Sequence, residues 1–223
     1  MGAPMAIDGE SAAYRAARDQ LLRAEVALRA ETERVAALRR TLPEGPRPQR
    51  DYRFAWADGD EVVDLAGLFA GKAALFFYSL MFAPDLGQGV CPMCAAMLDS
   101  LDGAAPHITD RVSVVVGARA APNEIAALKA ERGWRNLRLV SVDGDFNRDF
   151  NAETQDGGQL PMAHVWRMAG DGPRYFWGSE LFHHNEPAWA SHPRHVDAIW
   201  PLWNVFDLTP EGRGDDWFPK LEY

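Results

Sequence analysis

The sequence predicts an α/β domain built on a mixed β-sheet. Three segments of strand length, residues 73–78, 111–116 and 137–142, alternate with two helical segments, 92–101 and 122–132. This alternation favours parallel strands joined by helices, and the first segment, which is apolar throughout, is typical of a strand covered on both faces. A hairpin signal on either side of this core adds antiparallel strands. We therefore expect a central mixed sheet flanked by helices.

A long helix is expected before this domain. Residues 11–41 contain no Gly or Pro and are rich in Ala, Arg, Glu and Leu, a composition that favours helix. Apolar residues recur at every seventh position in this segment: Tyr14, Leu21, Leu28, Val35 and Leu42. The stripe predicts that the helix docks on the same subunit or on a partner subunit, or that it pairs as a coiled coil. Docking on a partner subunit or pairing as a coiled coil would make a homodimer through this helix. A solvated basic face is the simpler alternative.

The chain divides into three parts on composition. Residues 1–42 form the amphipathic helix, and residues 43–50 contain three prolines and no apolar anchor, which is typical of a linker. Residues 51–223 form the domain, which ends in an aromatic C-terminal extension.

The remaining elements follow from turn and cap signals. Residues 51–63 predict a hairpin around Asp58-Gly59-Asp60, and residues 64–70 a short helix capped by Asp64. A second hairpin, 163–177, turns at residues 169–172. Residues 194–203 predict an amphipathic helix whose face carries Trp200 and Trp203. This face predicts core packing or a subunit contact, or a wall of an aromatic ligand pocket near the cysteines.

Composition excludes several classes of function. The formal charge of −9 and a pI near 5.1 argue against nucleic acid as a partner. No window approaches the roughly 20 apolar residues of a membrane span, and the N-terminus lacks the basic and apolar regions of a signal peptide. We therefore expect a cytoplasmic protein in a reducing compartment, with no membrane partner.

The two cysteines, Cys91 and Cys94, are the sharpest chemical feature. They lie three residues apart in Cys-Pro-Met-Cys, between an apolar strand and a helix. A reactive cysteine needs its thiolate stabilised, and the unpaired N–H groups and dipole of a helix N-terminus do this. Cys94 lies one turn into the helix, close enough to form a disulfide with Cys91. The alternative is a pair of buried, inert thiols.

The order of elements resembles the thioredoxin-like superfamily over residues 51–178: hairpin, strand, Cys-Pro-Met-Cys, helix, strand, helix, strand, and Pro161 before a final hairpin. More specifically, four stretches resemble the bacterial thioredoxin-like domain-of-unknown-function family eight-nine-nine, which is related to alkyl hydroperoxide reductases. They are Phe77 to Cys94, Gly133-Trp134, Gly144 to Phe150, and Phe206 to Arg213. The resemblance spans nearly the whole chain and implies a thioredoxin-like central mixed sheet.

This resemblance implies roles for individual residues. Cys91 corresponds to the attacking thiol and Cys94 to the resolving thiol, while Leu160 and Pro161 correspond to the substrate-binding segment. Pro161 matches the family's cis-proline, and a trans loop proline is the alternative.

Two departures separate the chain from better-known relatives. Twelve residues lie between Tyr78 and Cys91, unlike in thioredoxins, and Gln88 replaces the threonine that peroxiredoxins place three residues before their reactive cysteine.

Other side chains offer weaker signals. The segment His183–His195 holds four of the six histidines beside Glu186, and could bind a metal alone or with the cysteines. Asp143, Asp145, Asn147 and Asp149 resemble a calcium loop but lack its terminal glutamate, so helix capping is expected instead. Asp85, six residues before Cys91, is either a proton shuttle for the thiols or an ordinary loop carboxylate.

These observations predict a thiol-disulfide oxidoreductase with Cys91 and Cys94 as catalytic residues, and no cofactor and no metal ligand are assigned. Its expected partners are a protein or small-molecule disulfide or oxidant and a reductant system. A dedicated peroxidase is less favoured because of Gln88. The alternatives are a copper or zinc handling protein that uses the cysteines and nearby histidines, and a non-catalytic thioredoxin-like interaction module.

Overall fold

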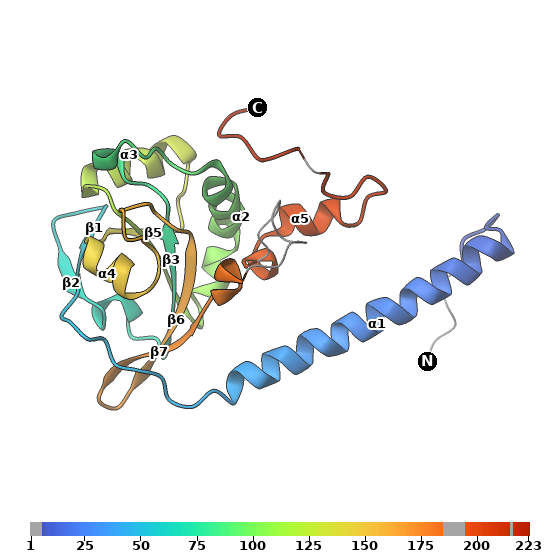
Figure 1. Ribbon diagram of the computed structural model, residues 1–223, viewed down its shortest axis with the longest axis horizontal. Helices are drawn as coiled ribbons and strands as arrows, with labels where there is room; N and C mark the ends of the chain where they lie inside the picture. The colour runs from blue at the N-terminus through green and yellow to red at the C-terminus, as the bar shows by residue number, and fades with distance from the viewer. Residues whose placement is uncertain (1–5, 185–194, 215) are drawn as a thin grey trace. The chain divides into compact units, whose positions relative to one another are not determined.

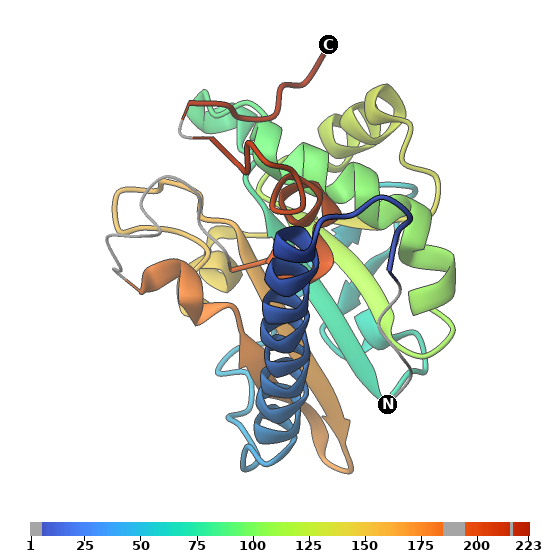
Figure 2. The same ribbon diagram turned by 90° about the vertical axis from the view of Figure 1, so that its right-hand side faces the viewer.

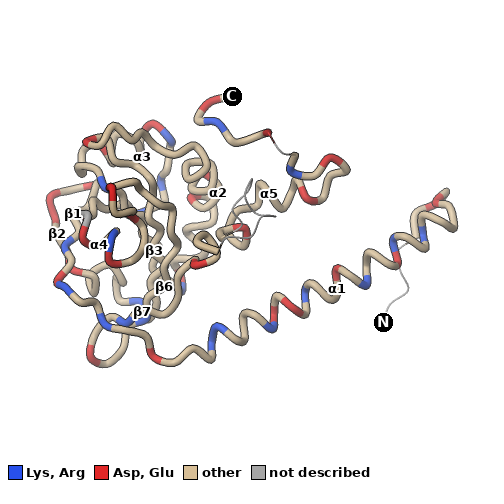
Figure 3. Tube along the Cα trace, viewed as in Figure 1, with Lys and Arg blue, Asp and Glu red and all other residues tan. Residues whose placement is uncertain are grey.

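A computed structural model describes residues 6–184, 195–214 and 216–223. The chain forms two compact units, Met1–Pro43 and Glu44–Tyr223. The first unit consists of helix α1, Ala12–Arg40, whose first turn is capped by Ser11 through a 3.1 Å bond from the Tyr14 N–H. None of its residues is buried, and charged residues are spread along its whole length (Figure 3). None of the described helices is long and apolar enough to cross a membrane.

The second unit is built on a seven-stranded mixed sheet with the strand order β2-β1-β5-β4-β3-β6-β7 (Figure 1). The strands are β1 Arg53–Trp56, β2 Val62–Asp64, β3 Ala74–Leu80, β4 Ser113–Ala118, β5 Arg138–Ser141, β6 Met162–Ala169 and β7 Gly172–Gly178. Strands β3, β4 and β5 are parallel, and the two hairpins pair antiparallel at the flanks. This arrangement confirms the predicted thioredoxin-like mixed sheet and both of its hairpins.

Helices cover both faces of the sheet. They are α2 Pro92–Ile108, α3 Pro122–Arg132, α4 Gly144–Asp149 and α5 Pro201–Phe206, with short 3-10 turns at Gly67–Phe69, Pro84–Leu86, Glu180–His183 and Asp197–Ile199. The core on one face takes side chains from α2, α3 and α5, whereas the core on the other takes them from α4 and the turn Gly67–Phe69. Helix α5 lies beside α2 in both views (Figures 1 and 2).

Helix α2 is seven residues longer than predicted, although Pro106 lies inside it. Proline cannot donate the N–H bond that would reach the carbonyl of Asp102. That carbonyl instead accepts a 3.1 Å hydrogen bond from the side-chain amide of Asn136. The helix therefore continues because a neighbouring loop satisfies the group that proline leaves unpaired.

Two predicted helices are wrong in extent. Residues 64–70 form only a single 3-10 turn, although Asp64 still accepts the Gly67 N–H at 2.8 Å. The predicted helix 194–203 is broken at Trp200, whose backbone is extended, and α5 begins at Pro201. A residue before proline is disfavoured in helical conformation, which explains the break.

The calcium-like segment serves as a helix cap, as expected. Asp143 precedes α4 and its carboxylate accepts the Phe146 N–H at 3.1 Å. Asp145 and Asp149 instead pair with Arg50, at 2.8 Å and 3.0 Å. These ion pairs attach the Pro-rich segment to the domain, together with a 3.0 Å bond from the Tyr175 N–H to the Pro46 carbonyl.

Arg213 joins separate parts of the C-terminal extension. The guanidinium of Arg213 contacts the carboxylates of Asp197 at 2.8 Å and Asp207 at 2.7 Å, and lies 5.5 Å from the ring centre of Trp203. Its side chain is only 7% exposed, so these contacts compensate a buried charge. These contacts join α5 to the preceding turn, and the buried Trp203 of α5 packs in the core on the face that carries α2.

Candidate active site

Cys91 occupies the N-cap position of α2, at the end of the loop that follows β3. Its own N–H bonds the Met81 carbonyl at 3.1 Å, and its carbonyl accepts the first helical bond, from Ala95, at 2.9 Å. Pro92 takes the first helical position, where a missing N–H costs nothing. Cys91 is half-buried, so its sulfur combines a helix N-terminus with access from solvent.

The geometry of this turn lowers the pKa of Cys91 to about 6. The largest cause is hydrogen bonding by the Cys94 thiol, and the backbone N–H groups of Cys94 and Met93 add to it, while burial opposes them. A free cysteine titrates near pH 8.5 and is mostly protonated at neutral pH. With its pKa lowered to about 6, Cys91 is mostly thiolate there.

Cys94 has the opposite properties. It is 2% exposed, and its pKa is raised because it donates its proton toward Cys91, because it is buried, and because the Cys91 charge lies nearby. The hydroxyl of Tyr78, at the end of β3, donates to the Cys94 sulfur at 3.4 Å and opposes that rise. The pair is therefore asymmetric, with one accessible thiolate and one buried thiol.

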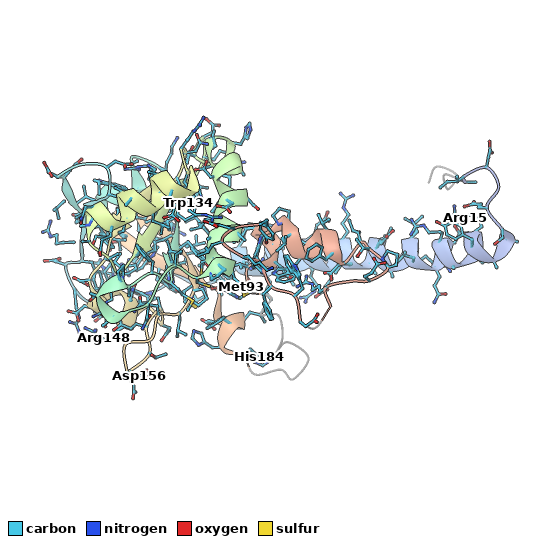
Figure 4. The ribbon with its side chains drawn as sticks, turned by 90° about the horizontal axis from the view of Figure 1, so that it is seen from above. Arg15, Met93, Trp134, Arg148, Asp156 and His184 are labelled. Atoms are coloured by element: carbon cyan, nitrogen blue, oxygen red, sulfur yellow. The ribbon has the colours of Figure 1, made fainter. Side chains whose placement is uncertain are left out.

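A cavity of about 240 Å³ opens beside the two sulfurs. All four predicted site residues, Cys91, Cys94, Leu160 and Pro161, line it. Sequence reasoning missed most of its other walls, which are methionine and aromatic side chains: Met81, Met93, Met97, Tyr78 and Phe182. Met93 projects from the first turn of α2, on the side of the C-terminal segment (Figure 4). The methionines at positions 81, 93 and 97 lie close to the cysteines in the sequence, which is a local signal for their part of the wall.

The C-terminal extension supplies the remaining wall of the cavity through His195, Val196 and Trp200. Trp200 is 3% exposed and packs in the core, so it serves both of the roles that its sequence position suggested. Burial lowers the pKa of His195 to about 4, against the opposing effect of Asp197, and its ring packs on Phe182 at 4.9 Å. His195 is therefore neutral at physiological pH.

The expectation of a cis peptide bond before Pro161 is wrong. The Leu160–Pro161 bond is trans. The chain runs from the bridge at Gln159 through Leu160 and Pro161 directly into β6, and the trans form, which proline itself favours by about 0.5–1 kcal/mol, suits this extended path. Pro161 nevertheless lies at the cavity.

Gln88, at the position of the peroxiredoxin threonine, connects two loops. Its side-chain oxygen accepts the Gln159 N–H at 3.3 Å. The Gln159 side chain in turn bonds Asn147 and Glu153, each at 3.0 Å, and Glu153 pairs with Arg119 at 2.9 Å. This buried polar network ties the loop before Cys91 to the segment before Pro161. A glutamine is long enough for that contact, whereas a threonine is not.

Asp85 does not line the cavity. Its side chain is 60% exposed and lies 3.9 Å from the Arg119 guanidinium. This is the geometry of a loop carboxylate, and it offers the thiols no direct proton path.

The histidine segment is only partly described. Residues 185–194, with Glu186 and His192, lie outside the described residues, and His183 and His184 do not line the cavity. Within the described ranges no three His, Cys, Asp or Glu side chains are grouped closely enough to hold a metal ion. The cysteines and His183 or His184 are therefore not brought together as a metal site.

Comparison with known proteins gives the family. The model of the family described as "Bacterial protein of unknown function (DUF899)" matches residues 5–223. The chain belongs to this family. The resemblance seen in the sequence is thereby confirmed. A comparison with curated proteins finds no match to this DUF899 protein.

Solved structures similar to this DUF899 protein are distant. Peroxidoxin BcpB from Mycobacterium tuberculosis is 12% identical with a TM-score of 0.48, covering 74% of this chain and 98% of its own. PrxQ from Xylella fastidiosa is 14% identical with a TM-score of 0.45, and the match covers 61% of this chain and 84% of PrxQ. Copper-bound ScoI from Bradyrhizobium japonicum is 16% identical with a TM-score of 0.38, and the match covers 58% of this chain and 87% of ScoI. Likenesses this weak transfer neither activity nor residue roles.

Proposed function

We propose that this DUF899 protein is a thiol-disulfide oxidoreductase that uses Cys91 and Cys94. The observation that carries the proposal is the asymmetric pair at the start of α2, where an accessible thiol of low pKa lies one turn from a buried thiol of raised pKa. Inert structural cysteines have no need of this difference. In thiol-disulfide exchange the difference lets the accessible thiolate attack the substrate and keeps the buried thiol to resolve the mixed disulfide.

In the first step, the Cys91 thiolate attacks one sulfur of a substrate disulfide. A Cys91–substrate disulfide forms, the substrate S–S bond breaks, and the departing thiolate takes a proton from solvent. In the second step, Cys94 loses its proton, which passes through solvent to the departing substrate thiolate, and attacks the Cys91 sulfur. The Cys91–Cys94 disulfide forms and the second substrate thiol leaves, so two electrons pass from the cysteine pair to the substrate. A dithiol reductant then restores the pair.

Tyr78 supports the second step. Cys94 must become a thiolate in a buried position, and an unpaired buried charge is costly. The Tyr78 hydroxyl is the side chain that donates to its sulfur, at 3.4 Å. Burial raises the pKa of Tyr78 well above its usual value, so this hydroxyl keeps its proton and remains a donor.

The test is reduction of a chromogenic disulfide by the purified, pre-reduced protein. Cys91→Ser should abolish turnover, by at least about 10³-fold, because serine at this position has no thiolate to attack. Cys94→Ser should still react once and then accumulate a mixed disulfide at Cys91, visible as an added mass. Unchanged turnover by Cys91→Ser, with its fold verified by circular dichroism, overturns the proposal.

A further inference from the structure

We infer that the cavity beside Cys91 selects an uncharged, low-molecular-weight disulfide that carries an apolar substituent about the size of an aryl ring. The inference rests on the proposed function and specifies its substrate class. The substituent fills the cavity while its sulfur faces Cys91.

The surface of the cavity is almost entirely carbon and sulfur. Met81, Met93, Phe182, Leu160 and Trp200 contribute apolar atoms, and no Asp, Glu, Lys or Arg is among the described residues that line it. His195 adds no charge, because it is neutral above its low pKa and both ring nitrogens are buried. A charged substituent would lose its hydration there and meet no opposite charge, since the unpartnered nitrogens of His195 and Trp200 are uncharged. An apolar substituent is stabilised by leaving water.

The volume limits the size of the substituent. A cavity of 150 Å³ lined by apolar side chains can hold benzene, so about 240 Å³ accommodates a substituted ring or a short alkyl chain. It is smaller than the roughly 300–1,000 Å³ typical of sites for drug-sized ligands. Tripeptide-sized thiols with several charges fit neither the volume nor the surface.

The backbone beside the cavity disfavours a peptide strand as the substrate. Pro161 has no N–H, and the N–H of Leu160 already bonds the Ala152 carbonyl at 2.9 Å. A peptide that lay along this segment would find no donor on either residue. A small molecule needs none, because the cavity holds it through apolar contact.

Reduction of such a substrate balances as in the proposed cycle. The Cys91 thiolate bonds the sulfur that carries the apolar group, and the other half leaves as a thiolate. Cys94 then releases the apolar thiol and forms the Cys91–Cys94 disulfide. Both electrons come from the cysteine pair, and a dithiol such as dithiothreitol restores it in the assay.

The experiment compares 2-pyridyl disulfides that share one leaving group. The full chain is reduced and reacted with ethyl, butyl and benzyl 2-pyridyl disulfides, and with a carboxypropyl analogue close in length to the butyl one. Each rate is divided by that of the same probe with 2-mercaptoethanol, which removes intrinsic reactivity. We expect a rise of about threefold for each added CH₂ and at least about tenfold discrimination against the carboxylate.

A charge placed in the cavity should remove the rate advantage that an apolar substituent gains there. Met93→Glu should slow the butyl probe at least about tenfold relative to Met93→Leu, which keeps the wall apolar. Leu86→Glu is the matched control, because Leu86 is 42% exposed on the loop before Cys91 and does not line the cavity. It should leave the corrected rate of the butyl probe within about twofold of wild type.

The outcomes separate the two proposals. Equal corrected rates for all probes, still lost in Cys91→Ser, overturn the selectivity of the cavity and leave the oxidoreductase standing. A disulfide-bonded peptide reduced faster than the benzyl probe also overturns the small-molecule assignment. If no probe depends on Cys91, the proposed function fails and the inference fails with it.

Discussion

Tyr78 and Ser79 are neighbours on β3, but they point to opposite faces of the sheet and into two different kinds of buried site. On the α2 face, Tyr78 contacts a cysteine pair that opens into a cavity. On the α4 face, the Ser79 hydroxyl lies 3.4 Å from His164, whose other ring nitrogen lies 3.1 Å from the Tyr175 hydroxyl. Both ring nitrogens of His164 therefore have partners, and aromatic rings fill the space around it.

The two sites perturb pKa values by similar amounts. Burial lowers the pKa of His164 to about 3, and the thiol arrangement lowers that of Cys91 to about 6. A perturbed pKa is often taken to mark a functional site. Here the difference lies in access, because Cys91 is half-buried beside a cavity and His164 is 0% exposed among aromatic rings. We therefore assign chemistry to the α2 face and stability to the α4 face.

The largest effect is expected from a substitution in the core on the α4 face. Phe146 is fully buried, and its ring lies 5.2 Å from Tyr52 and from Phe54, and 4.9 Å from Phe77 and from Phe150. Phe146→Ala should lower the free energy of unfolding by about 3–5 kcal/mol, because it removes a buried ring and leaves a void. Chemical denaturation measures this loss.

Cys91 alkylation is the second measurement on the same variant. Its pH midpoint should stay within about 0.3 units of wild type wherever the variant remains folded. Phe218→Ala, at a side chain 42% exposed, is the control and should cost less than about 1 kcal/mol. A shifted midpoint in Phe146→Ala would show that the two faces are coupled.

His164 provides the next test, through pH. The pKa of His164 is about 6.5 in the unfolded chain and about 3 in the folded chain. Between these pH values, His164 is protonated in the unfolded chain and neutral in the folded chain. The stability from neutral His164 is fully present above about pH 6.5 and falls as pH drops toward 3, by up to about 1.4 kcal/mol per pH unit. His164→Gln should flatten the stability profile over this range, as measured by urea denaturation at several pH values.

The exposed His107 provides the matched control for that experiment. His107→Gln should leave the profile parallel to wild type. If His164→Gln also runs parallel to wild type, His164 titrates normally, and the assignment of the α4 face as a closed, stabilising site is wrong.

The sequence predicts the sheet better than the cavity, for a physical reason. Strand 73–78 is apolar throughout, and helix 122–132 begins at Pro122 and is capped at its C-terminus by Gly133, whose φ is +70°. Such signals are local. The break at Trp200 was also locally encoded, because Pro201 restricts the residue before it. The extension of α2 was not, because it depends on Asn136 bonding Asp102 across the fold.

The candidate site shows the same division. Cys91 and Cys94 could be placed from their spacing and from the strand before them, and Pro161 from its position before the last hairpin. Phe182 and His195 could not, because they come from irregular segments after the sheet and reach the cavity only through tertiary packing. Nothing in their own sequence context marks them.

Tyr78→Phe tests the α2 face with the smallest expected effect. It removes the hydroxyl that donates to Cys94 and leaves the ring. The second step should slow by about tenfold, equivalent to about 1.4 kcal/mol, because the buried Cys94 thiolate loses its side-chain donor and keeps the backbone N–H of Met81. The first step should keep its rate, since attack by Cys91 comes before Cys94 is ionised. Rapid-quench mass spectrometry, which follows the Cys91 mixed disulfide, resolves the two steps.

Tyr52→Phe is the matched control, since it removes a tyrosine hydroxyl that donates to Asp149 at 2.6 Å on the α4 face. That variant should lose stability without a change in either rate. The opposite result, in which Tyr78→Phe leaves the decay of the mixed disulfide unchanged, would mean that Cys94 ionises without help from Tyr78. The contrast between a chemical face and a structural face would then rest on Cys91 and the cavity alone.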